Sequence, residues 1–97
     1  MKQLIASICQ KKEHFVCRQT GAELLLIPLK DNVADFNQYL TLNEVGSFIW
    51  ENMSCEDDET SLVSKICVEF DADEQLVKKD VMMFLPKLHQ FVIGAWY

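Results

Sequence analysis

The spacing of apolar residues changes near residue 42, and this change constrains the fold more than any other feature of the sequence. Before it, short β-prone runs alternate with turn residues. After it, apolar residues recur as they do on one face of a helix. Residues 14–19 and 22–27 are the clearest early runs, and Gly21 in the short loop between them indicates a β-hairpin. The pattern therefore predicts a small sheet first and helices afterwards.

The two ends of the predicted sheet are less regular. Pro28 has no N–H to donate to a ladder, so we expect it to end the second strand. A third strand is expected at residues 38–41. Residues 1–12 form an N-terminal extension of what we expect to be a single domain, residues 1–97. Three apolar residues of this extension would line one side of a short helix: Leu4, Ile5 and Ile8.

The first strongly predicted helix begins at Thr41–Asn43. Thr41 and Glu44 have the spacing of a capping box, and Asn43 is the competing cap. Gly46 lies in the first turns, where glycine costs about 1 kcal/mol relative to alanine, so it indicates close packing against another element. The apolar stripe of this helix is Val45, Phe48, Ile49 and Met53, with Trp50 at its edge. A second amphipathic helix carries Leu62, Val63, Ile66, Cys67 and Phe70.

The last helix is expected to begin after a cap at Asp73, and Pro86 should kink or end it at a cost of about 3 kcal/mol. Residues 91–97 are then expected to return over the core as an extended segment. The core stripe is Val77, Val81, Phe84, Leu85 and Leu88. Together these elements predict an α+β fold of winged helix-turn-helix type, in which a three-stranded antiparallel sheet precedes a three-helix bundle.

Charge and cysteine spacing limit the classes of partner. The net charge is −6, with 15 acidic residues against 9 basic ones, which disfavours nucleic acid and anionic membranes. No apolar run reaches the about 18 residues of a membrane span, so we expect a cytoplasmic protein. Because no two cysteines have metal-ligand spacing, we expect no metal site, and we expect no cofactor. In a reducing cytoplasm all four cysteines are expected to be free thiols. The cysteines are Cys9, Cys17, Cys55 and Cys67.

Several short segments, in order, resemble the PqqD-like family. Leu42-Asn43-Glu44 followed by Phe48-Ile49-Trp50-Glu51 resembles the family's "LNE…IWE" segment. The likeness continues through Glu69–Asp73, Asp80-Val81 and Phe84-Leu85 to Leu88, and residues 18–28 (RQTGAELLLIP) resemble the family's first hairpin. It spans residues 14–93, and its specificity lies in the order and spacing of the segments.

The resemblance implies a recognition domain. PqqD-like domains bind the leader part of ribosomally made precursor peptides and present the peptide to a modifying enzyme, often a radical SAM enzyme. The leader adds as a strand beside the third β-strand, in a groove bounded by the third helix. Carried over to this sequence, the resemblance implies that the following residues bind the peptide: Phe36, Asn37, Gln38, Tyr39, Leu40, Thr41, Leu76, Lys79, Asp80, Met83 and Lys87.

Physical chemistry supports this expectation in part. An edge strand exposes unpaired N–H and C=O groups that can hold an extended peptide. Met83 is an adaptable side chain for a groove wall, and Lys79 and Lys87 would meet acidic leader residues. The alternative is that Met83 belongs to the core and the lysines are solvated surface. Pro86 departs from the family's third helix, and residues 1–12 lie outside the resemblance.

Three other functions compete. An enzyme is disfavoured because no nucleophile–base pair or phosphate loop is readable. A winged-helix DNA reader would need a basic recognition helix, whereas the last helix mixes lysines with acids and Arg18 is the sole arginine. A scaffold or assembly module, including a homo-oligomer formed through an open strand edge, fits as well. Its interface would use exposed aromatic residues: Phe36, Tyr39, Trp96 or Tyr97.

Overall fold

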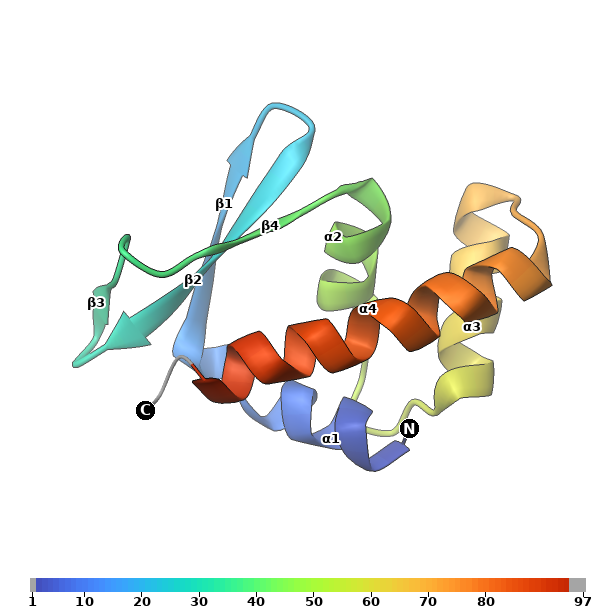
Figure 1. The fold of residues 1–97 in the computed structure, drawn as a ribbon, viewed down its shortest axis with the longest axis horizontal. Coiled ribbons are helices and arrows are strands. Elements are labelled where there is room, and N and C mark those ends of the chain that lie inside the picture. The colour runs from blue at the N-terminus through green and yellow to red at the C-terminus, as the bar shows by residue number, and fades with distance from the viewer. Residues whose placement is uncertain (1, 95–97) are drawn as a thin grey trace.

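The computed structural model describes residues 2–94 as an α+β structure with an antiparallel sheet, which is the predicted class (Figure 1). Within these residues, three α-helices follow the sheet and one precedes it. In chain order the elements are α1 (Lys2–Gln10), a short 3-10 turn η1 (Lys12–His14), β1 (Phe15–Thr20), β2 (Glu23–Lys30), β3 (Val33–Ala34), β4 (Leu40–Leu42), α2 (Glu44–Asn52), α3 (Glu59–Phe70) and α4 (Glu74–Gly94).

The sheet is organised around β2. On one side β1 pairs antiparallel with it, from Phe15 opposite Pro28 to Thr20 opposite Glu23. On the other side β4 pairs antiparallel with residues 24–26 of β2, and β3 pairs with residues 29 and 30. In the described part of the chain the sheet therefore has four strands instead of the three predicted, and the winged helix-turn-helix description stays a prediction.

Two local features account for the difference in the sheet. Asp31 and Asn32 both have positive φ, 53° and 64°, which suits a tight two-residue turn, so β2 continues into a hairpin with β3. Pro28 lies inside β2 instead of ending it, because it faces the first residue of β1, where that ladder stops. Its carbonyl accepts a hydrogen bond from the Asp35 N–H at 2.9 Å. The expected third strand is shorter than predicted and begins only at Leu40.

Helix α2 is capped by Asn43, the competing choice, and not by Thr41. The Asn43 side chain accepts a hydrogen bond from the Gly46 N–H at 2.8 Å. The close packing predicted for Gly46 is confirmed, because a Cβ there would lie 3.2 Å from the Phe84 ring of α4. Trp50 is buried in the core, not at the edge of the stripe, and meets the Phe15 ring edge-on at 5.9 Å. Helix α2 therefore joins the sheet to α4.

Helix α4 continues through Pro86 to Gly94, so of the two predicted effects of Pro86, a kink or an end, the end is wrong. Pro86 is exposed, while Val77, Val81, Leu85, Leu88 and Val92 are buried along the opposite face. Burial of that face stabilises the helix across Pro86. The carbonyl that loses its N–H donor because of the proline can accept a hydrogen bond from water instead. Residues 91–94 are helical and not extended, and Ala95, Trp96 and Tyr97 lie outside the described residues. None of the helices within residues 2–94 is long and apolar enough to cross a membrane.

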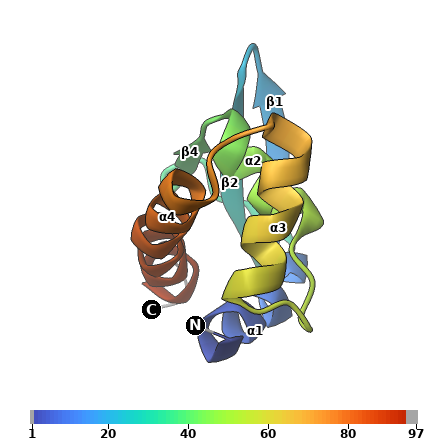
Figure 2. The same cartoon turned by 90° about the vertical axis from the view of Figure 1, so that its right-hand side faces the viewer.

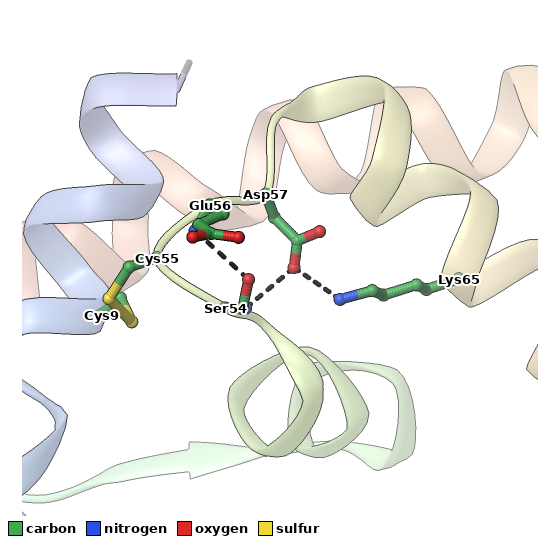
Figure 3. Close-up of a disulfide and its surroundings, with 6 residues drawn as sticks. All are labelled: Cys9, Ser54, Cys55, Glu56, Asp57 and Lys65. Atoms are coloured by element: carbon green, nitrogen blue, oxygen red, sulfur yellow. Dashed lines mark hydrogen bonds and ion pairs between the residues drawn. A yellow bond between two sulfur atoms is a disulfide. The ribbon is translucent and has the colours of Figure 1, made fainter.

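The N-terminal extension is a helix, α1, with Ile5 and Ile8 wholly buried as the apolar spacing predicts. Ser7 Oγ lies 3.2 Å from Nε2 of His89 on α4. A disulfide joins Cys9 to Cys55 in the loop between α2 and α3, with 5.3 Å between the two Cα atoms (Figure 3). The expectation of four free thiols is therefore wrong for this pair, because packing brings together cysteines 46 residues apart.

Removing the disulfide should lower stability. The double variant Cys9→Ser/Cys55→Ser should lose up to about 4 kcal/mol of unfolding free energy, because the bond closes a long loop in the unfolded chain. Urea unfolding followed by circular dichroism measures this loss. Cys17 is an exposed free thiol, so Cys17→Ser is the matched control and should unfold like the wild type. Equal unfolding midpoints for the two variants would show that the disulfide contributes no stability.

Candidate functional site

A groove of about 320 Å³ lies between α2 and α4, just after the end of β4. Its apolar floor comes from α2 and Phe84, and its polar rim comes from α4 and the Asn43 cap. The groove is lined by Asn43, Val45, Gly46, Ile49, Asp80, Met83, Phe84 and Lys87.

The local sequence explains why a groove forms here. Gly46 has no side chain and lets the Phe84 ring approach the backbone of α2, which leaves open space above the contact. Asp80, Met83 and Lys87 recur at helical spacing, so they lie on one face of α4. All three side chains are exposed, Met83 at 56%. The alternative that Met83 belongs to the core is therefore wrong.

The unpaired edge of β4 lies on the same side of the molecule as α4. Among the strands of residues 2–94, β4 pairs with β2 alone, so its other edge has no strand neighbour there. Figure 2 places β4 on the α4 side of β2 and β1 on the far side. An extended chain laid against this edge would pass beside the groove.

The structure brings together only some of the residues expected at the site. Asp80, Met83 and Lys87 line the groove, and Leu40 and Thr41 lie on β4. Residues 36–38 belong to the turn before β4, where the Asn37 N–H donates to the Asp35 carboxylate at 3.1 Å and the Gln38 N–H donates to the Asp35 carbonyl at 3.3 Å. Tyr39 lies just before the strand. Leu76 and Lys79 are exposed on α4 outside the groove lining.

Sequence reasoning missed the other side of the groove. The sequence indicates only a capping role for Asn43, and it assigns Val45, Ile49 and Phe84 to apolar core stripes, although Phe84 is only half-buried. The one available signal was Gly46, since a costly glycine within a helix indicates a close approach. That signal does not say which residue approaches.

The acidic loop before α3 is structural. Asp57 is 5% exposed and accepts hydrogen bonds from Lys65 Nζ at 2.7 Å and from the Ser54 N–H at 2.8 Å (Figure 3). It also accepts a hydrogen bond from the Ser61 hydroxyl at 2.8 Å. Burial alone would raise the pKa of Asp57, but these hydrogen bonds and the Lys65 charge outweigh it and hold the pKa below its usual value. The carboxylate is therefore already satisfied by protein groups.

Neither nucleophilic nor metal chemistry finds support elsewhere in the part of the chain that the structure describes. Although Cys17 is exposed as a residue, partial desolvation of its thiol raises the pKa of that thiol, which disfavours the reactive thiolate. Burial lowers the pKa of neighbouring Lys12, whose Nζ lies 5.4 Å from the centre of the Trp50 ring. No group of three or more histidine, cysteine or acidic side chains within residues 2–94 could hold a metal ion.

The fold and the groove define a small α+β domain with an open strand edge. The chain belongs to the PqqD family, since the family model described as coenzyme PQQ synthesis protein D (PqqD) matches residues 19–90. Its structure is similar to one described as "TbiB1 in Complex with the TbiA(beta) Leader Peptide", with a TM-score of 0.58 and 28% sequence identity over 78% of this chain and 83% of that chain. Curated proteins offer no match. The family resemblance read from the sequence is confirmed.

The buried carboxylate predicts an acid-sensitive stability. The pKa of Asp57 is lower in the folded chain than its ordinary value of 3.8, so its contribution is present above that value and is lost as pH falls through the folded pKa. Asp57→Asn should destabilise the fold by about 1–3 kcal/mol at neutral pH and flatten the loss of stability below about pH 4. Urea unfolding at a series of pH values measures both effects.

Glu56→Gln is the matched control, because it changes an exposed carboxylate of the same loop. Its unfolding free energy should follow the wild type across the series. If Asp57→Asn keeps the full acid sensitivity of the wild type, Asp57 does not cause it.

Proposed function

We propose that this chain binds the leader part of a ribosomally made precursor peptide and presents the peptide to a modifying enzyme, without carrying out chemistry itself. The observation that carries the proposal is the edge of β4 beside the groove, which has no strand partner within residues 2–94. Membership of the PqqD family supports it, and so does the likeness to TbiB1, whose structure is described with a leader peptide. The leader would add to β4 as a further strand.

Backbone pairing and the groove would contribute differently to binding. Strand β4 has three residues, so it offers only a few hydrogen bonds, each contributing about 0.5–1.5 kcal/mol net. Burial of a leader side chain against the groove must therefore supply much of the affinity. Burial of that side chain would also supply the specificity, because hydrogen bonds between backbones do not distinguish one side chain from another.

The proposed contacts fall into two groups. Leu40 and Thr41 would pair with the leader backbone, while Asp80, Met83 and Lys87 would contact its side chains. The remaining expected residues would flank the peptide at the turn before β4 and on the exposed face of α4. They are Phe36, Asn37, Gln38, Tyr39, Leu76 and Lys79.

The identity of the modifying enzyme is a further prediction, with a radical SAM enzyme as the expected partner. Its gene would lie next to the gene of this chain and that of a short precursor peptide. DNA binding and a purely structural role remain the alternatives. The mixed charge of α4, where Lys78 pairs with Glu59 and Asp80 lies beside Lys79, disfavours DNA. Self-association through the open edge is a prediction that light scattering would test.

Two neighbouring methionines give a matched test of the groove. Met83 lines it, whereas Met82 is 49% exposed and lies outside its lining. Met83→Glu should weaken binding of the precursor leader encoded beside the gene by about tenfold or more, because burial of a methionine contributes about 1.5–3 kcal/mol. Met82→Glu should stay within about threefold of the wild type. Isothermal titration calorimetry measures both, and equal losses would exclude the groove as the site.

Strand addition itself predicts an alternating pattern in the peptide. Successive N–H groups of an added strand point alternately toward β4 and away from it. N-methylation of the leader at one position at a time should therefore weaken binding at every second position, by about tenfold where the N–H pairs with β4. A uniform effect along the peptide would argue against strand addition.

A further inference from the structure

The groove carries two opposite charges on one helix face. Asp80 and Lys87 both line it, with Met83 between them. Within residues 2–94, neither charge forms an ion pair, although Lys78 nearby on the same helix pairs with Glu59 at 3.7 Å. A carboxylate and an ammonium group are therefore both available to a ligand in the groove.

The direction of β4 relative to α4 sets the order in which a bound strand meets these charges. At one end of the sheet, the ring of Phe15 lies 5.9 Å from Phe91 near the end of α4. At the other end, Leu42 leads into α2, where Gly46 approaches Phe84. Leu40, the first residue of β4, pairs nearer the Phe15 end of the sheet than Leu42 does, so β4 runs away from that end. Helix α4 runs toward it, and the two elements therefore run in opposite directions (Figure 1). A peptide antiparallel to β4 would run with α4 and meet Asp80 before Lys87.

An antiparallel peptide is the natural orientation here, because all three strand pairs of this sheet are antiparallel. Along α4, Asp80 and Lys87 are about 10 Å apart at 1.5 Å per residue. Side chains on one face of a strand recur about every 6.6 Å. If an apolar residue of the peptide lies opposite Met83, the peptide residues two positions before it and two positions after it would therefore come within reach of Asp80 and Lys87.

We propose that the groove selects a segment in which a basic, an apolar and an acidic residue occupy alternate positions, in that order from the N-terminus. The basic residue contacts Asp80, the apolar residue packs on Met83 and the acidic residue contacts Lys87. This inference rests on the proposed function and specifies which leaders the site accepts. The inference predicts that the groove distinguishes two peptides of equal net charge when their basic and acidic residues stand in opposite order.

Selection of random linear peptides displayed on phage tests the proposal. The library is selected on the full wild-type chain and, separately, on the charge-exchanged variant Asp80→Lys/Lys87→Asp. The wild type should enrich basic–x–apolar–x–acidic peptides, and the variant should enrich the reverse order. A synthetic peptide of the enriched type should bind the wild type about tenfold more tightly than the same peptide with its two charges exchanged, because two attractive pairs become repulsive.

The outcomes separate this inference from the proposed function. Three outcomes overturn the inference alone, provided that the enriched peptides bind Met83→Glu less tightly than the wild type. The peptides show no charge order, they show the reverse order on the wild type, or the charge-exchanged variant selects the same order as the wild type. If no peptide is enriched, or if enriched peptides bind Met83→Glu undiminished, the proposed function fails as well. Both charged residues are exposed, so the variant should fold, which circular dichroism checks. The neutral variants Asp80→Asn and Lys87→Gln should each abolish the preference at one position.

Discussion

Burial of one continuous face of α4 holds the structure together. Helices α1 and α3 pack on this long helix (Figure 2). Its Phe84 side chain meets α2 at Gly46. Because the core occupies one face, the opposite face stays exposed and carries the rim of the groove. Helical continuity through Pro86 is essential to that rim. If α4 ended there, Lys87 would no longer lie two turns from Asp80 on the same face.

The site combines a minimal strand edge with a small groove, and the two would act together. An edge of three residues is too short to hold a peptide firmly through backbone hydrogen bonds alone. A groove of about 320 Å³ accepts little more than one large side chain with its neighbours. Recognition would therefore depend on a short peptide segment that contacts Met83, Asp80 and Lys87, while pairing with the β4 edge would set the direction of the peptide.

Helix α1 lies outside the part of the chain that the family model matches. It lies before residue 19, where the match begins, yet it completes the core with Ile5 and Ile8. The disulfide from Cys9 to Cys55 attaches α1 to the loop that also contains the Asp57 network (Figure 3). This attachment lies on the α1 side of α4, away from β4, so it can stabilise the fold without entering the groove.

The sequence by itself determined the class, the first hairpin and the helices. Apolar periodicity located the hairpin, the helices and the buried face of α4, and the order of short motifs indicated the PqqD family, because these signals depend on neighbours along the chain. The α4 side of the groove followed from the family resemblance. Tertiary structure decided the rest: the Cys9–Cys55 bond, the passage of α4 through Pro86, the burial of Asp57 and the meeting of Gly46 with Phe84. Each depends on contacts between residues distant in sequence, and a local pattern contains no information about which distant residues will meet.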